Sequence, residues 1–144
     1  MVQSLAGMAI VDADTQETRA AALQLAGRVL ISAIFLISAI VKITAPTAII
    51  GFIASVGLPF PQLGLAIGIL VEAVGAIALL LGYRTRPVAA ILAAYCLATA
   101  IFFHSQWSDQ NQLMHFWKNM AMMGGLLQLV ALGAGRFSLD QRTR

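Results

Sequence analysis

Four stretches of this sequence are long and apolar enough to cross a lipid bilayer, and they constrain the fold more than any other feature. They run from about residue 22 to 43, 62 to 81, 87 to 103 and 116 to 132. A membrane-spanning helix needs about 20 predominantly apolar residues. Backbone groups at lipid depth must be hydrogen-bonded internally, and the alternation of a β-barrel strand is missing, so the stretches predict helices. The expected fold is all-α, a four-transmembrane-helix bundle over residues 22–133.

Composition and charge exclude several classes of protein. Hydrophobic residues make up 60% of the 144 residues and charged residues 10%, whereas soluble domains have about 45–50% and about 25%. The net charge is +3, but the nine Lys and Arg form no basic run, so membrane lipid and not nucleic acid is the expected partner. Because Cys96 is the only cysteine, an intrachain disulfide, a CxxC redox pair and a cysteine zinc site are excluded.

Basic residues are distributed unevenly between the two ends of the predicted bundle. Only Lys42 and Lys118 lie at one end, and seven arginines lie at the other: Arg19, Arg28, Arg84, Arg86, Arg136, Arg142 and Arg144. The positive-inside rule therefore places both termini in the cytoplasm. Residues 1–21 lack a basic segment ahead of their apolar residues, so we expect a retained cytoplasmic N-terminal tail and not a cleaved signal. Residues 134–144 form the expected cytoplasmic C-terminal tail.

The segment between the first two spans predicts a short helix. Thr44 is a suitable N-cap, Pro46 suits the first helical turn, and Gly57 with Pro59 ends the helix. The apolar residues between them share one face, so we expect this helix to lie at the outer membrane surface.

Glu72 lies about midway along the second predicted span. A charge at the bilayer centre costs roughly 2.5–3.5 kcal/mol on insertion scales, and such residues usually face the bundle interior. Gly64 and Gly68 precede Glu72 at steps of four and share its helix face, where small residues permit close packing. We therefore expect Glu72 to face inward, either as a functional carboxylate or as a structural one that is protonated or paired.

The first span offers two cations for Glu72. Steps of three and four place Arg28, Ser32, Phe35, Ala39 and Lys42 on one helix stripe. Arg28 is the expected partner, and Lys42, at the outer end, is the alternative. Snorkelling toward the membrane surface is the competing interpretation for both side chains.

Polar residues also gather at the outer ends of the third and fourth spans. His104 ends the third span, and Lys118 and Asn119 follow His115 at the start of the fourth. We expect His104, Lys118 and Asn119 to line an outward-facing pocket with Lys42. The alternative for the histidines is a hydrogen-bonding role at the interface. No metal site is predicted, because no recognisable ligand spacing accompanies the two histidines.

Several short motifs follow one another in a definite order over residues 25 to 140. They are Gly27-Arg28-Val29-Leu30, Ile37-Ser38-Ala39-Ile40-Val41-Lys42, Gly57-Leu58-Pro59, Val71-Glu72, Gly82-Tyr83-Arg84-Thr85-Arg86, Phe103-His104, Phe116-Trp117-Lys118-Asn119 and the tail from Gly133 to Asp140. In this order they resemble the DoxX family of small bacterial membrane proteins. One departure is Ala39, where the family often has glycine three residues before its lysine.

The resemblance implies a four-helix protein of the bacterial plasma membrane. Some relatives are associated with quinone-linked sulfur oxidation or with membrane redox complexes, and most have no assigned activity. The sequence contains no Rossmann glycine pattern, thiol pair or flavin site, so any electron carrier is a bound quinone or belongs to a partner. No covalently bound cofactor is expected.

Three functions remain open at this point. The leading hypothesis is an accessory or quinone-interacting membrane subunit of a redox system, with a redox enzyme or a second copy of the chain as partner. The alternatives are a scaffold or assembly factor without a site of its own, and a small proton-linked transporter that uses Glu72. Whether the protein is an enzyme is left open.

Overall fold

The computed structural model describes residues 2–142, with side chains from residue 14 onward. Residues 1, 143 and 144, at the ends of the two predicted tails, lie outside the described residues, and so does the basic charge of Arg144. Within the described residues the chain forms six α-helices and no strand, so the prediction of an all-α fold is confirmed.

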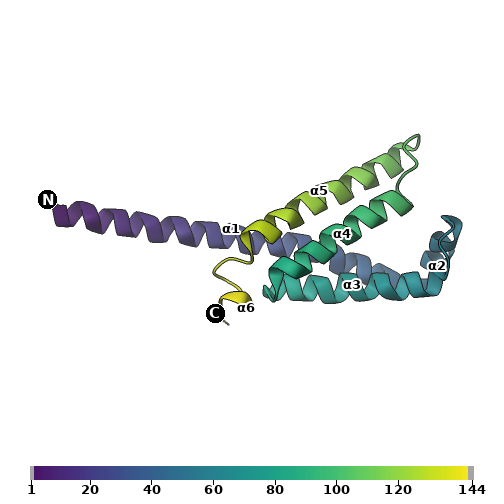
Figure 1. The fold of residues 1–144 in the computed structure, drawn as a ribbon, viewed down its shortest axis with the longest axis horizontal. Helices are drawn as coiled ribbons and strands as arrows, with labels where there is room; N and C mark the ends of the chain where they lie inside the picture. The colour runs from purple at the N-terminus through teal and green to yellow at the C-terminus, as the bar shows by residue number, and fades with distance from the viewer. Residues whose placement is uncertain (1, 143–144) are drawn as a thin grey trace.

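Four long helices correspond to the predicted spans: α1 (Val2–Thr44), α3 (Pro61–Leu81), α4 (Thr85–Phe103) and α5 (Gln110–Leu132). Three of them have segments long and apolar enough to cross a membrane, namely Asp14–Thr44, Pro61–Leu81 and Thr85–Phe103. The predicted N-terminal tail is helical from residue 2 and continuous with the first span (Figure 1). These helices make the protein a helical membrane bundle.

The long helices associate as two pairs. Helix α1 packs on α3, α4 packs on α5, and α3 joins the pairs by contacting α4. Figure 1 shows the α4–α5 pair inclined away from α3 toward the end where α2 lies. The apolar core includes Ala76, Leu79, Leu92 and Leu126, all fully buried, together with Phe35 of α1, so all four long helices contribute to it.

The short helix predicted between the first two spans is present as α2 (Pro46–Ser55), and Gly57, with a φ of 78°, follows it. The expected capping by Thr44 is wrong. Its hydroxyl instead lies 2.9 Å from the Ile40 carbonyl oxygen, one turn earlier in α1. Ala45 therefore occupies the N-cap position, without a side-chain cap.

Arg28 fastens the C-terminal segment to the end of α3. Its fully buried guanidinium donates to the carbonyl oxygens of Leu79 (3.3 Å) and Leu80 (3.2 Å), and also to that of Phe137. The last carbonyls of a helix have no partner within the helix, so a buried arginine is well suited to them. Gly82, with a φ of 66°, is the C-cap residue at which α3 ends.

Helix α6 (Leu139–Arg142) then lies beside the turn between α3 and α4. The Asp140 carboxylate accepts hydrogen bonds from the backbone N–H groups of Arg84 (2.6 Å) and Thr85 (2.8 Å). Polar contacts thus hold the C-terminal segment against the turn between α3 and α4.

Candidate functional site

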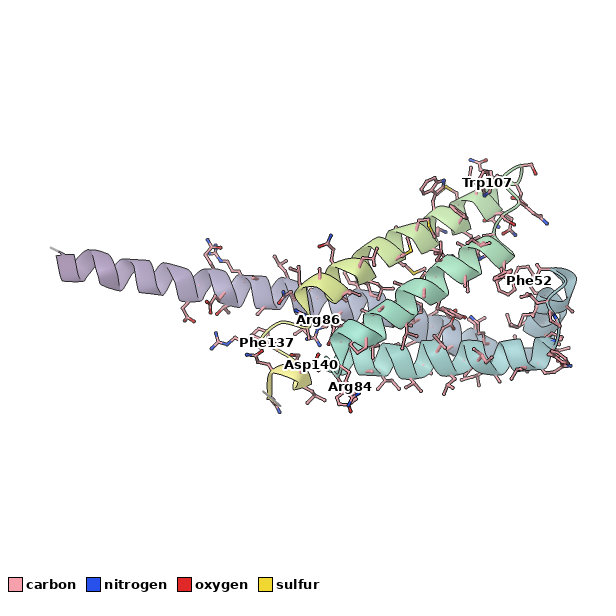
Figure 2. All side chains as sticks on the ribbon, viewed as in Figure 1. Phe52, Arg84, Arg86, Trp107, Phe137 and Asp140 are labelled. Atoms are coloured by element: carbon pink, nitrogen blue, oxygen red, sulfur yellow. The ribbon has the colours of Figure 1, made fainter. Side chains whose placement is uncertain are left out.

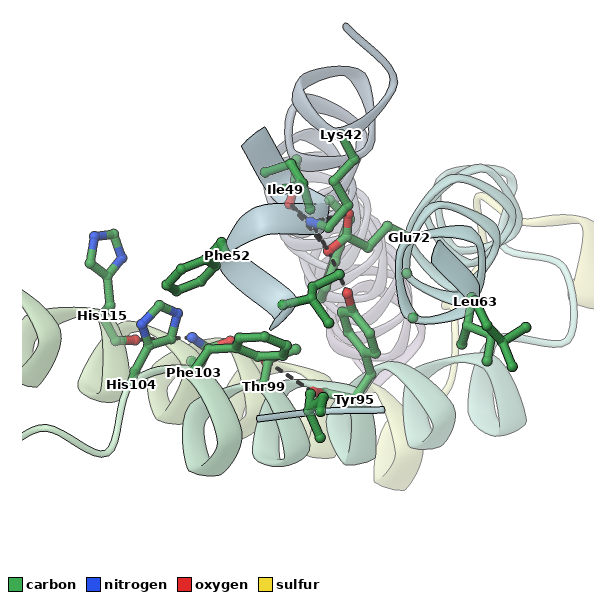
Figure 3. Close-up of a pocket in the computed structure, with 18 of the residues that line it drawn as sticks. Lys42, Ile49, Phe52, Leu63, Glu72, Tyr95, Thr99, Phe103, His104 and His115 are labelled. Atoms are coloured by element: carbon green, nitrogen blue, oxygen red, sulfur yellow. Dashed lines mark hydrogen bonds and ion pairs between the residues drawn. The ribbon is translucent and has the colours of Figure 1, made fainter. Parts of the chain in front are cut away.

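A buried ion pair joins α1 to α3. Lys42 Nζ lies 2.9 Å from both carboxylate oxygens of Glu72, and the Glu72 side chain is only 5% exposed (Figure 3). Gly68, one turn before Glu72, is also buried, and a Cβ added there would lie 3.2 Å from the Tyr95 hydroxyl oxygen. The prediction that Glu72 faces inward is therefore confirmed and Gly68 is buried with it, whereas Gly64, two turns before Glu72, is exposed.

Two hydroxyl groups complete the hydrogen bonding of the pair. Ser38 Oγ donates to Glu72 Oε1 (3.1 Å) and accepts from Lys42 Nζ (2.8 Å). The Tyr95 hydroxyl of α4 donates to the same carboxylate oxygen at 2.9 Å. These four residues, Ser38, Lys42, Glu72 and Tyr95, are called the polar cluster below. Lys42 and Glu72 form an ion pair of opposite charges, so the cluster as a whole carries no net charge.

The expected pairing of Glu72 with Arg28 is wrong. The Arg28 guanidinium is held at the far end of α3 by three carbonyl oxygens, so it is not available to the carboxylate. The rest of the predicted α1 stripe is buried: Ser32, Phe35 and Ala39 are each less than 5% exposed. Lys42, the alternative partner, is the cation that reaches Glu72.

The polar cluster lines a cavity of about 650 Å³. Most of the wall is apolar and comes from α2, from the loop that follows α2, and from α3. The lining residues are Ile34, Phe35, Ser38, Lys42, Ile49, Phe52, Ile53, Leu58, Pro59, Phe60, Leu63, Gly64, Ile67, Gly68, Glu72, Tyr95, Thr99, Phe103, His104, His115, Asn119 and Met122. The cavity, called the pocket below, is therefore amphipathic, with charged groups in an otherwise apolar wall.

A second set of polar groups lines the pocket from α4 and α5. The rings of His104 and His115 stack with centroids 5.0 Å apart, and His104 Nδ1 lies 2.7 Å from Gln112 Oε1. Asn119 Oδ1 lies 3.1 Å from Thr99 Oγ1, and Asn119 Nδ2 donates to the His115 carbonyl oxygen at 3.0 Å. Figure 3 shows the two histidines on the opposite side of Phe52 from Lys42 and Glu72.

The structure brings together three of the four residues predicted to form the pocket. Lys42, His104 and Asn119 line it, whereas Lys118 is exposed and does not. Sequence reasoning did not include Ser38, Tyr95, Thr99 or His115 among the site residues. The position of Ser38 one helical turn before Lys42 is a signal that could have been used, because residues four apart share a helix face.

The donor set suits hydrogen bonding more than metal ligation. Among residues 14–142, no three His, Cys, Asp or Glu side chains gather as metal ligands do. The lining offers a neutral polar cluster, two imidazole rings and one amide, all beside apolar surface. Such a site can orient an uncharged polar group while it buries an apolar body.

Comparisons with known proteins agree with this membrane architecture. The model of the DoxX family matches residues 23–105. The chain belongs to the DoxX family. It is 34% identical over 125 residues to the inner membrane protein YphA of Escherichia coli K12, a match that covers 83% of this chain and 89% of YphA. It is 33% identical over 117 residues to the inner membrane protein YqjF of the same organism, with coverage of 81% and 88%.

No solved structure matches this DoxX protein. The family match includes the whole polar cluster and His104 but ends before His115 and Asn119. Together with the apolar helices, the two relatives support a multi-pass inner membrane protein.

Proposed function

We propose that this DoxX-family protein binds a quinone in the pocket and acts as an accessory membrane subunit of a redox system. The observation that carries the proposal is the neutral polar cluster set into the wall of an apolar cavity. A quinone has the matching chemistry, because its carbonyl oxygens accept hydrogen bonds and its ring and tail are apolar. The volume of about 650 Å³ lies within the range of about 300–1,000 Å³ of ordinary ligand pockets.

The charge of the cluster favours a neutral ligand over an anionic one. Lys42 already contacts both oxygens of Glu72 and the Ser38 hydroxyl, so its ammonium protons have acceptors. An incoming carboxylate would meet the negative charge of Glu72 at short range in a medium of low dielectric constant. A quinone carbonyl avoids this repulsion and can accept hydrogen bonds from the imidazole or amide groups of His104, His115 and Asn119.

Purified protein should be stabilised by a short-chain benzoquinone. At about ten times the Kd, binding to the folded state adds about 1.4 kcal/mol, which should raise the melting temperature by about 2–6 °C. Decanoate, which has a comparable apolar chain but a charged head, should give less than a third of this shift. The measurement is thermal unfolding in mild detergent, followed by circular dichroism.

The substitution Asn119→Leu should weaken quinone binding about five- to tenfold, because it removes a hydrogen-bonding group from the pocket. Gln128→Leu is the matched control, since Gln128 lies on the same helix, is exposed and does not line the pocket. Equal quinone affinity in both variants, or an equal shift with decanoate and quinone, would contradict the proposal.

We further propose that α5 is a fourth membrane span and that both termini are cytoplasmic. Helix α5 has 23 residues and packs along α4, which supports a return across the membrane. Polar residues concentrated near its start account for its lower hydropathy. The excess of arginine at the end that carries both termini supports the orientation.

This topology predicts opposite results for two reporter fusions. Alkaline phosphatase, which is active only outside the cytoplasm, should be inactive after residue 144 and active in the α4–α5 loop after Trp107. Green fluorescent protein should fluoresce at the C-terminus. Phosphatase activity at the C-terminus would reject the arrangement with four spans and cytoplasmic termini.

A scaffold function is the second candidate. It is favoured because the residues of the polar cluster already hydrogen-bond to one another. Lys42, Glu72, Ser38 and Tyr95 satisfy one another without a ligand and tie α1, α3 and α4 together. A scaffold requires no occupant for the pocket. Mass spectrometry of gently purified protein separates the two functions, because only the first predicts a retained quinone.

A further inference from the structure

A polar hollow of about 590 Å³ lies at the opposite end of the bundle from Phe52. It is formed by the turn between α3 and α4, the end of α5 and the C-terminal segment, and three arginines line it: Arg84, Arg86 and Arg136. Figure 2 shows Arg84 and Arg86 at this end, near Phe137 and Asp140. Neither the quinone proposal nor the polar cluster involves these residues.

We propose that this hollow binds a phosphate group, such as the headgroup phosphate of an anionic phospholipid. Helix α3 ends at Leu81 and α4 begins at Thr85, and both are long and apolar enough to cross a membrane. The hollow therefore lies where membrane spans end, which is the depth of phospholipid headgroups. Arginine is well suited to phosphate because its planar guanidinium can donate two parallel hydrogen bonds.

The charges around the hollow leave the arginines free for a ligand. Among the described residues, neither the Arg84 nor the Arg86 side chain has a hydrogen-bond acceptor. Glu17 and Asp140 also line the hollow, but the Asp140 carboxylate is engaged by two backbone N–H groups at the start of α4. Within the described residues, the Arg136 guanidinium forms an ion pair with Asp14 at 3.5 Å, and because both side chains are more than half exposed, this weak pair can yield to a phosphate.

A buried hydroxyl supplies independent support. Thr85 lines the hollow and is fully buried, and its Oγ1 has no hydrogen-bond partner among the residues that the structure describes. A buried polar atom without a partner is unfavourable and calls for an explanation. A phosphate oxygen held by the adjacent arginines is an acceptor that would satisfy this hydroxyl.

The test is a titration of the full chain in detergent with phosphatidylglycerol, followed by native mass spectrometry. The double variant Arg84→Gln, Arg86→Gln should bind about tenfold more weakly than the wild type. The matched control Arg19→Gln, Arg142→Gln removes two arginines from the same end of the bundle but outside the hollow, and it should change the affinity less than twofold. Equal losses in the two double variants would overturn the proposal, because they would indicate general attraction to anionic lipid.

Thr85→Val distinguishes a ligand contact from a structural role. The valine has nearly the same shape and removes only the unpartnered hydroxyl, so the melting temperature of the lipid-free protein should not fall. Phosphatidylglycerol affinity should fall about threefold or more, whereas unchanged affinity would exclude Thr85 from the site.

A parallel titration with inorganic phosphate identifies the source of the group. A melting-temperature rise that depends on Arg84 and Arg86 would assign the site to free phosphate, whereas a response only to phosphatidylglycerol assigns it to lipid. A response to neither ligand in the wild type would overturn the proposal.

Discussion

Replacing Lys42 by methionine should lower the free energy of unfolding by about 3–5 kcal/mol, because it leaves the Glu72 carboxylate buried without its cation. The remaining donors, Ser38 and Tyr95, are neutral and cannot replace a charge that contacts both carboxylate oxygens. The pair also links α1 to α3 beside the pocket, so the loss should loosen this end of the bundle. Reversible unfolding in mixed detergent micelles measures the change.

Lys118→Met is the matched control, since Lys118 is exposed and makes no contact with the pocket. We expect it to change the stability by less than about 0.5 kcal/mol. The double substitution Lys42→Met, Glu72→Met should recover only part of the loss, because it removes the unpaired charge but leaves the Ser38 and Tyr95 hydroxyls without their partners. If Lys42→Met costs no more than Lys118→Met, the ion pair does not stabilise the fold.

The same ion pair illustrates how far the sequence could predict the site. An acidic residue among apolar ones, with glycines one and two turns before it, was sufficient to orient Glu72 inward. The prediction that Arg28 pairs with Glu72 was wrong. The carbonyl oxygens at the end of α3 compete for Arg28, and every residue has a backbone carbonyl, so the sequence does not indicate which carbonyls will accept from an arginine. Arg28 donates to the carbonyl oxygens of Leu79 and Leu80 at the end of α3, so Lys42 is the cation that binds Glu72.

The bounds of the second and third predicted spans were predictable because a membrane imposes both length and hydropathy on a helix. The predicted 62–81 and 87–103 differ from α3 and α4 by at most two residues at each end. Helix α5 begins six residues before the predicted 116, because Asp109 caps it by accepting a hydrogen bond from the Asn111 N–H at 2.8 Å. Polar residues precede the apolar window there, so hydropathy alone placed the start too late.

The angular spacing of residues around α5 explains why Lys118 was wrongly predicted to line the pocket and why His115 was missed. Lys118 and Asn119 are adjacent and therefore project about 100° apart around α5, so only one of them can face the pocket. His115 and Asn119, four residues apart, share the lining face. Tyr95 gives no comparable signal, since its hydroxyl is one group within an apolar helix and its partner lies 23 positions away in the sequence.

Gly82→Ala should be among the most damaging single-methyl additions to this chain, with a loss of about 3–5 kcal/mol in the free energy of unfolding. The residue has a φ of 66°, which non-glycine residues adopt at a cost. An added Cβ would also collide with Arg28 Nη1 and with Ser138 Cβ. Arg28 would then have to release the carbonyl oxygens that hold the C-terminal segment. Unfolding in mixed micelles measures the loss.

Gly57→Ala separates backbone strain from collision. Gly57 has a similar φ of 78°, but an added Cβ there would meet nothing within 4 Å, so its cost should be the strain alone, about 1–2 kcal/mol. The excess of Gly82→Ala over Gly57→Ala then measures the contact with Arg28 and Ser138. In an Arg28→Met background the excess should shrink, because the displaced guanidinium is already absent. An undiminished excess in that background would mean that Ser138, and not Arg28, sets the requirement for glycine at this turn.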